Sequence, residues 1–167
     1  MADMDTVFDA LSFEESVSAV TATNSVDLGS RRVWKGEEYV YCFNAGGSQA
    51  SPSYGLKIVT GASGYSVAVT SLTDTAHPFV GVVKHATLTT DTYGWVMTRG
   101  FVSVENDADS TITGDYVALA LSKDGTFHQA YPVTDAVGVG TFNVVGFGLD
   151  VDTASGGSFY AMIRSGI

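Results

Sequence analysis

Apolar and polar side chains alternate with a period of two over much of the chain from residue 31 onward, which is the spacing of β-strands. In the first such run, Tyr39 and Tyr41 fall on one face and Val40 and Cys42 on the other. Clusters of Gly, Asp, Asn and Ser separate the further strand-like runs, which cover residues 55–60, 79–85, 93–97, 99–104, 115–121, 126–131, 142–151 and 157–164. Short strands at this density predict an all-β core, either a compact β-sandwich or a β-barrel.

The turns between these runs favour hairpins. The pair Asp124-Gly125 tolerates positive φ and predicts a tight hairpin that joins residues 115–121 to residues 126–131. No helix of ordinary length is expected between residues 31 and 167, so helical crossovers between parallel strands are not expected either.

Residues 1–30 have a different pattern. Met4, Phe8 and Leu11 recur at a spacing of three to four, which predicts a short helix with acidic residues near its start. Ser, Thr and Asn are frequent in residues 16–30, and this composition equally fits a flexible arm that orders against a partner.

The chain is therefore expected to consist of an acidic N-terminal arm, residues 1–30, and an all-β core domain, residues 31–167. The candidate partner-binding residues are large apolar side chains of the arm: Phe8, Leu11 and Phe13. Apolar side chains on an arm leave water only when a partner covers them.

A short pattern within the core recurs after 65 residues without a gap (164 − 99 = 65). Its first copy contains Val80, Gly81, Trp95, Met97 and Arg99, and its second contains Val145, Gly146, Tyr160, Met162 and Arg164. A strand that gains or loses one residue turns its side chains to the opposite face, so an unbroken register indicates that one unit is present twice. We therefore predict an internal duplication of a strand-turn-strand unit.

Composition is that of an ordered, turn-rich protein. Hydrophobic residues make up 45% of the chain and charged residues only 16%, which argues against general disorder. The 19 glycines against 3 prolines favour many tight turns. A chain of 167 residues is long enough for one domain with a sizeable core.

The formal net charge is −10, and residues 1–30 carry six acidic residues without any Lys or Arg. Phosphate groups are repelled by such a surface, so we expect no nucleic-acid partner and no membrane partner.

The single cysteine, Cys42, allows no intrachain disulfide. The acidic N-terminus differs from a signal peptide, and no apolar run approaches the roughly 20 residues that cross a bilayer, so we expect a soluble protein.

The motifs predict no catalytic residue, no metal site and no cofactor. His77, His85 and His128 lack the close spacing of zinc ligands. The acidic run at 105–109 lacks the glycine and the final glutamate of an EF-hand, which predicts a solvated loop. Cys42 lies in an apolar strand without a nearby base, which predicts a buried, inert thiol.

Four runs follow one another in the second half of the chain: Phe-Val-Gly-Val-Val from Phe79, Gly-Trp-Val-Met-Thr-Arg-Gly-Phe-Val-Ser-Val from Gly94, Ile-Thr-Gly-Asp-Tyr-Val-Ala-Leu from Ile112, and Lys-Asp-Gly-Thr from Lys123. Their order resembles that in the capsid decoration, or cement, proteins of tailed bacteriophages. Residues 144–167 look like a variation on the same unit, and residues 1–60 contribute nothing to the resemblance.

The resemblance implies a non-enzymatic virion structural protein that is made in the host cytoplasm and is located on the capsid exterior. Such a protein binds the major capsid protein and stabilises the shell by bridging capsid subunits. A homo-oligomer, most simply a homotrimer, is expected. The resemblance assigns no individual functional residues.

Two other functions remain open at this point. The first is a carbohydrate-binding β-sandwich of a head fibre or tail appendage, for which Trp34, Trp95 and Tyr160 are candidate stacking platforms. Buried rings at these positions favour the scaffold, whereas exposed coplanar rings in a groove favour sugar binding. The second is a small β-barrel enzyme, which requires His85 or His128 to meet an acid in a cleft.

Overall fold

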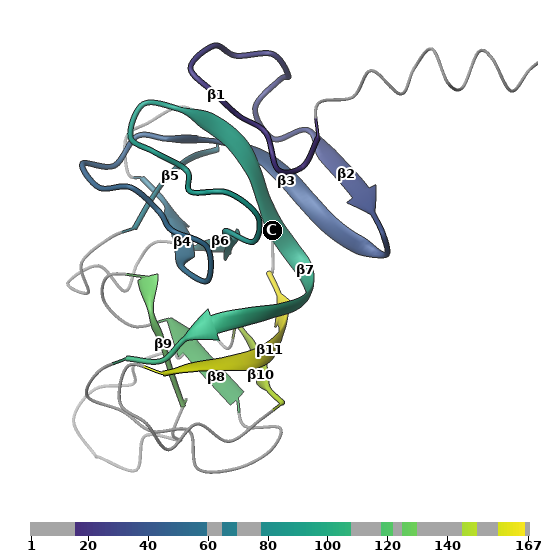
Figure 1. Ribbon diagram of the computed structural model, residues 1–167, viewed down its shortest axis with the longest axis vertical. Helices are drawn as coiled ribbons and strands as arrows, with labels where there is room; N and C mark the ends of the chain where they lie inside the picture. The colour runs from purple at the N-terminus through teal and green to yellow at the C-terminus, as the bar shows by residue number, and fades with distance from the viewer. Residues whose placement is uncertain are drawn as a thin grey trace, which may run out of the picture.

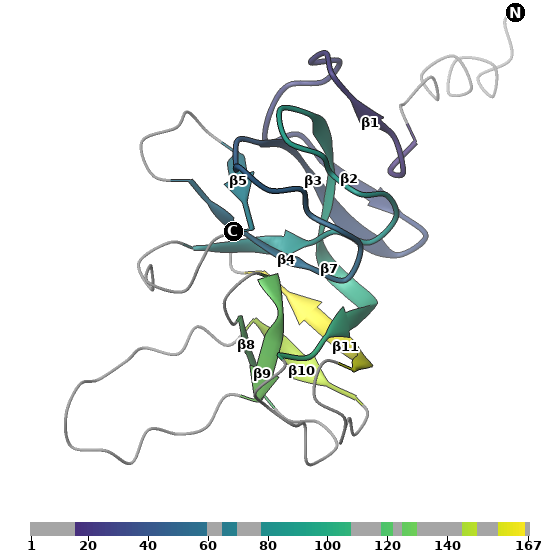
Figure 2. The same ribbon diagram turned by 60° about the vertical axis from the view of Figure 1, so that its left-hand side comes forward.

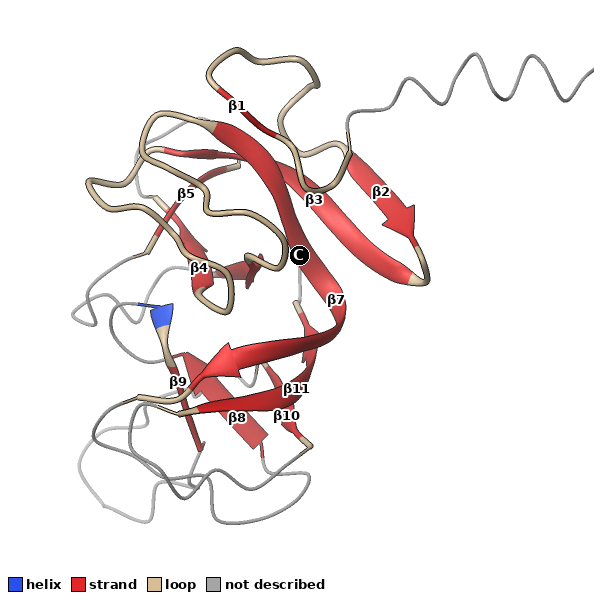
Figure 3. Cartoon of the chain, in the orientation of Figure 1, coloured by secondary structure: helices blue, strands red, loops and turns tan. Residues whose placement is uncertain are grey.

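Strands and their connecting loops form nearly all of the described chain in the computed structural model, with one 3₁₀ position at Gly125 (Figure 3). The structure describes residues 16–59, 65–69, 78–107, 118–121, 125–129, 145–149 and 157–165. The prediction of an all-β fold is confirmed. Within these ranges there is no helix with the length and apolar character needed to cross a membrane.

The first half of the core closes into a five-stranded barrel. Its strands are β3 (Glu37–Asn44), β4 (Gly55–Ile58), β5 (Ser66–Ala68), β6 (Phe79–Val82) and the first part of β7 (Tyr93–Glu105). They are hydrogen-bonded in the order β3, β5, β4, β6, β7, and β7 pairs again with β3. The β3–β5 pair is parallel, and the other four pairs are antiparallel.

The second half of the core repeats this arrangement, and β7 runs through both halves (Figure 1). Its strands are the second part of β7, β8 (Ala118–Leu121), β9 (Phe127–Gln129), β10 (Gly146–Gly148) and β11 (Ser158–Arg164). The order is β7, β11, β10, β8, β9, with every pair antiparallel. A parallel bridge between Asn106 and Phe127 brings β9 back to the end of β7, as β5 meets β3 in the first barrel.

Equivalent backbone hydrogen bonds indicate that the likeness of the two halves extends beyond the sequence repeat. The Asn44 amide donates to the Thr92 carbonyl oxygen at 2.9 Å, and the Asn106 amide donates to the Gly157 carbonyl oxygen at 2.8 Å. Thr92 and Gly157 have the 65-residue separation of the sequence repeat (157 − 92 = 65). The duplicated unit is thus larger than the strand-turn-strand unit that the sequence predicts.

The repeated glycines lie where neighbouring strands approach each other most closely. A Cβ atom at Gly81 would collide with the carbonyl oxygen of Met97, and one at Gly146 would collide with the carbonyl oxygen of Met162. The obstacle in each barrel is backbone, so no side-chain rotation can relieve it.

Strand β7 joins the two barrels by a sharp bend. The sequence predicts two strands at 93–97 and 99–104, but the structure has one continuous strand, so this division is wrong. β7 bends along its length (Figure 1), and it contains Gly100, whose φ of 146° is in the region that favours glycine. The register of β3 against β7 also shifts between Glu38 and Tyr39, which is a β-bulge beside the bend.

Two short strands extend the first barrel. β2 (Arg31–Trp34) pairs with the outer edge of β3, and β1 (Val20–Thr21) pairs with β7 (Figure 2). Val17, just before β1, is only 4% exposed. The chain from residue 16 onward therefore packs on the core, whereas the predicted N-terminal helix or arm up to residue 15, with Phe8, Leu11 and Phe13, lies outside the described residues.

The core consists of two hydrophobic clusters. One fills the first barrel with side chains such as Val40, Leu56, Val80 and Val96. The other fills the second barrel and continues between the barrels, and its members are Val17, Tyr39, Phe79, Val82, Met97, Val102, Val104, Leu119, Phe127, Val145, Phe159, Ala161 and Ile163. The two barrels are therefore packed against each other through apolar contacts.

Candidate protein-interaction face

Large apolar side chains form a cross-strand row on the outer face of the second barrel. Phe101 in β7 is the Cα partner of Met162 in β11, and Met162 is the Cα partner of Phe147 in β10. Phe101 is 54% exposed, Met162 39% and Phe147 47%. Tyr160 precedes Met162 by two residues on the same face and is 64% exposed. These side chains form one apolar surface because cross-strand neighbours are close in space.

Strand β11 has apolar side chains on both of its faces. Phe159, Ala161 and Ile163 point into the barrel and are buried, while Tyr160 and Met162 point outward. A strand with one face in water normally alternates apolar and polar residues. Since a whole aromatic side chain has about 200 Å² of surface, the exposed part of the four side chains amounts to roughly 400 Å². Apolar patches of this size on monomers often serve in binding.

A second cross-strand row runs beside the first and crosses four strands. Val33 in β2, Glu38 in β3, Arg99 in β7 and Arg164 in β11 are successive Cα partners. Arg99 Nη1 donates to Glu38 Oε1 at 3.1 Å. The Arg164 side chain has no acidic partner within the described part of the chain. This row therefore adds one uncompensated positive charge next to the apolar row.

We call the exposed side chains of the two rows, together with Tyr160, the interaction face, and its members are Val33, Arg99, Phe101, Phe147, Tyr160, Met162 and Arg164. It contains every exposed large apolar side chain of the described residues. Aromatic, Met and Arg side chains are enriched in protein–protein interfaces, whereas Lys and Asp are depleted there. The composition of this face is therefore that of a protein-binding surface.

The first barrel has an equivalent apolar row, and there the row is buried. Tyr39 and Val82 are the Cα partners of Met97, as Phe101 and Phe147 are of Met162. The exposed fractions of Tyr39, Met97 and Val82 are 1%, 0% and 0%. The duplication thus gives two copies of one surface, of which one is covered and the other is open.

Elements outside the repeat contribute to covering the row of the first barrel. Val17 belongs to the same buried cluster, and Trp34 of β2 packs against it. The His85 ring stacks on Tyr39 with 5.8 Å between ring centroids, and Trp34 meets His85 edge-on at 5.7 Å. In the first barrel, Trp34 lies on β2, the strand that precedes β3. In the second barrel, the strand that corresponds to β3 is the second part of β7, which continues directly from the first barrel, so the described residues contain no counterpart of β2 or Trp34 there.

A polar cluster lies between the barrels beside the interaction face. The Tyr39 hydroxyl donates to Glu37 Oε2 at 2.5 Å and lies 2.9 Å from His85 Nε2. Lys84 Nζ donates to Glu37 Oε1 and also to the carbonyl oxygen of Phe101 at 2.8 Å. Lys84 therefore ties the first barrel to the strand that carries Phe101.

The charges of this cluster compensate one another. Burial raises the pKa of the Glu37 carboxyl, but hydrogen bonds from Lys84 and Tyr39 outweigh that effect and hold the pKa below its usual value. Burial lowers the pKa of the His85 imidazole, and the Lys84 ammonium lowers it further. Burial and the hydrogen bond to Glu37 raise the pKa of Tyr39. At neutral pH, Glu37 is thus a stable carboxylate paired with Lys84, an arrangement typical of a structural ion pair.

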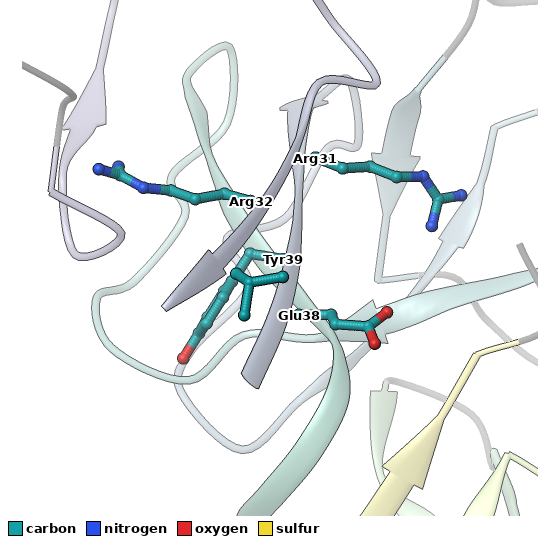
Figure 4. Close-up of a pocket in the computed structure, with 5 residues that line it drawn as sticks. Arg31, Arg32, Glu38 and Tyr39 are labelled. Atoms are coloured by element: carbon teal, nitrogen blue, oxygen red, sulfur yellow. The ribbon is translucent and has the colours of Figure 1, made fainter. Parts of the chain in front are cut away.

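A pocket of about 160 Å³ lies on the β2–β3 hairpin. Figure 4 shows that Arg31 and Glu38 extend to one side of the hairpin, whereas Arg32 and Tyr39 lie on the other. The polar groups do not converge on one point, and the volume is below the roughly 300 Å³ at which ligand pockets begin. This pocket is therefore a poor candidate for a small-molecule site.

The other residues that the sequence singles out do not form a reactive site. Cys42 is buried, and burial raises the pKa of its thiol, as expected for an inert cysteine. His128 is half-buried on β9 beside the buried Phe127. Asn106 is 1% exposed at the bridge that closes the second barrel, so the prediction of a solvated loop is wrong for that residue. The described residues contain no group of three His, Cys, Asp or Glu side chains placed to hold a metal ion.

The sequence pattern does not identify Phe101, Phe147 and Met162 as surface residues. Met162 belongs to the repeat, and its equivalent Met97 is buried, so the two methionines differ only in what covers them. The available signal is the run Phe159 to Ile163, in which both faces of a strand are apolar. Such a run indicates that both faces are covered in the functional state.

No protein-family model matches the chain, and no curated protein matches it. Among solved structures, it is similar to the N base of the head fiber protein gp8.5 of bacteriophage phi29, with a TM-score of 0.44 and 15% sequence identity. The matched region covers 77% of this chain and 98% of that chain. A likeness of this size carries no functional conclusion.

Proposed function

We propose that this chain is a structural protein of a tailed-phage virion, which binds the outer surface of the capsid and stabilises the shell by bridging capsid subunits. The observation that carries the proposal is the interaction face, an open apolar surface with arginines on a fold built from two barrels. The resemblance of residues 79–126 to capsid decoration proteins supports the major capsid protein as the proposed partner.

The physical basis of this function is multiple attachment. Separating two capsid subunits that are joined by a bridging protein also requires breaking that bridge. Several weak contacts made by one linked assembly act together, because the first contact raises the effective concentration for the next. A linked assembly of two-barrel molecules, each of which presents this binding face, fits this role.

We propose a binding role without catalysis. Glu37 and Lys84 compensate each other, and the Tyr39 hydroxyl is hydrogen-bonded to Glu37, so these groups are occupied in holding the barrels together. A catalytic acid or base needs a free group in a cleft beside its substrate. The polar groups around the 160 Å³ pocket diverge instead.

Co-sedimentation with capsids that lack this protein tests the proposal. The wild-type chain should be retained on the capsids, whereas Met162→Lys should reduce the retained fraction at least about tenfold, which corresponds to 1.4 kcal/mol of binding free energy. Thr90→Lys is the matched control, since Thr90 is exposed in a loop of the first barrel, away from the interaction face. Equal retention of wild type and Met162→Lys contradicts the proposal.

Carbohydrate binding is a second candidate, favoured by the 64% exposure of Tyr160. The two tryptophans support it less. The Trp95 ring packs against Tyr41 at 5.1 Å between centroids, and the Lys35 ammonium lies over the Trp34 ring at 4.3 Å from its centroid. A glycan array separates the candidates: binding that Tyr160→Ala abolishes supports a sugar site, and absence of any glycan binding supports the virion scaffold.

A further inference from the structure

We propose that the interaction face of one copy binds residues 7–13 of a second copy of this chain. The inference rests on the proposed function and specifies it: the face acts in shell bridging by linking copies of this chain, and its loss lowers capsid retention because multiple attachment is lost. A chain of copies linked in this way would place several bound molecules across neighbouring capsid subunits.

The internal duplication indicates what kind of element covers this surface. In the first barrel, the equivalent row is buried in a cluster that includes Val17, the second described residue after the N-terminal segment. The residues just before it in the sequence are also rich in large apolar side chains: Val7, Phe8, Leu11 and Phe13. One stretch of the chain therefore supplies a member of the cluster in which the first row is buried and apolar side chains suited to the open row.

Charge selects this segment over a face-to-face contact between two copies. Two interaction faces placed against each other would bring four arginines into one interface, of which only the two copies of Arg99 have an acidic partner, and uncompensated like charges at an interface are costly. Residues 1–15 carry five acidic residues and no basic residue. Arg164 has no acidic partner among the described residues, so an acidic segment supplies what the face lacks.

The segment is long enough to reach a neighbour. Residues 7–13 lie three to nine residues before Ser16, the first described residue, so in extended conformation they extend at most about 10–32 Å from it, which reaches the face of a copy that packs beside this end of the described chain. Residues 7–13 combine large apolar side chains with Asp9 and are followed by Glu14 and Glu15, so one short stretch matches an apolar row that has Arg99 and Arg164 beside it.

Mixing two full-length variants tests the inference by mass in solution. One variant, Phe8→Asp with Leu11→Asp, has a damaged segment and an intact face, and the other, Met162→Lys, has a damaged face and an intact segment. The wild type should be larger than a monomer, and each variant alone should be monomeric, with at least about a tenfold loss of association. An equimolar mixture should form a one-to-one complex, because one good segment then meets one good face.

Three results would each overturn the inference. The first is a monomeric wild type at every concentration. The second is a segment variant that keeps the wild-type mass, which would mean that copies associate through another surface. The third is a mixture that stays monomeric when both variants give wild-type circular dichroism and melting. Met162→Leu, which keeps the apolar surface, should retain the wild-type mass.

Capsid retention separates this inference from the proposed function. A wild type that forms the predicted complexes but does not co-sediment with capsids supports the inference and contradicts the function. A monomeric wild type that co-sediments supports the function and contradicts the inference.

Discussion

Arg99 and Arg164 occupy the same position in the two repeats and face each other as cross-strand partners in β7 and β11. Next to them, the Ser165 amide donates to the Thr98 carbonyl oxygen at 2.8 Å, so the ends of the two repeats are joined by hydrogen bonds. Like charges directly opposite each other destabilise a strand pair. The Glu38 carboxylate balances the charge of Arg99 but not that of Arg164. Arg164 is therefore better suited to binding an acidic partner than to stabilising the fold.

Arg164→Glu should weaken association and leave the fold intact. The substitution replaces a like-charge pair by an opposite-charge pair, so the free energy of unfolding should stay the same or rise by up to about 1 kcal/mol at low salt. Association should fall, because the face then repels an acidic segment. Urea unfolding and sedimentation velocity measure the two effects, and Arg164→Lys, which keeps the charge, is the control. A loss of stability without loss of association would contradict the binding role of Arg164.

Gly81→Ala and Gly146→Ala should both destabilise the protein by about 1–3 kcal/mol, because each added Cβ meets a backbone carbonyl in the adjacent strand. Gly47→Ala is the control, since a Cβ at Gly47 meets no atom within 4 Å, and its stability should be unchanged or slightly higher. Urea unfolding gives the three values. If only one of the two repeat glycines is sensitive, the close strand contact is not shared by the two barrels.

Met97→Ala and Met162→Ala compare one repeat position in a covered and in an open setting. Met97 is 0% exposed and Met162 is 39% exposed. The first substitution should cost about 2–5 kcal/mol of unfolding free energy, and the second less than about 1 kcal/mol in dilute monomer. Similar losses for both variants in dilute solution would mean that Met162 is covered by its own chain.

The positions of the strands are the part of the fold that the sequence predicts well. Strict alternation locates β3, and Tyr39 and Val40 do lie on opposite faces, in two different hydrophobic clusters. The Asp-Gly pair correctly predicts the β8–β9 hairpin, in which Gly125 has φ 80°. Local patterns suffice here because strand periodicity and turn conformation depend on neighbouring residues.

Closure of the barrels and exposure of the face do not follow from local patterns. The parallel pair of β3 and β5 and the bridge from Asn106 to Phe127 join residues that are distant in sequence. Met97 and Met162 have the same place in the repeat, yet only Met97 lies in a buried cluster with Val17 and Trp34 beside it. Burial at equivalent positions therefore depends on the segments that cover them.

Stability should fall as the pH falls from neutral, in two stages. The pKa of His85 is lowered in the folded protein from its usual 6.5, so the unfolded chain binds a proton first and stability is lost as the pH falls below that value. The pKa of Glu37 is lowered from 4.5, so its contribution is present above that pH and is lost as the pH falls through the folded-state value.

Unfolding free energies measured in urea between pH 8 and 3 test this dependence. His85→Gln should flatten the upper stage, and Glu37→Gln should be less stable at neutral pH but lose less stability below pH 4.5. Identical pH profiles for wild type and both variants would show that this cluster does not control acid stability.

Oxidation of Met162 on isolated capsids tests most directly whether the interaction face is buried in the virion. With Met97 as the internal reference for a buried methionine, peroxide should oxidise Met162 quickly in dilute protein and at least about tenfold more slowly in capsid-bound protein. If Met162 is oxidised equally fast in both states, the face stays in water in the assembled particle and is not the surface through which this protein binds.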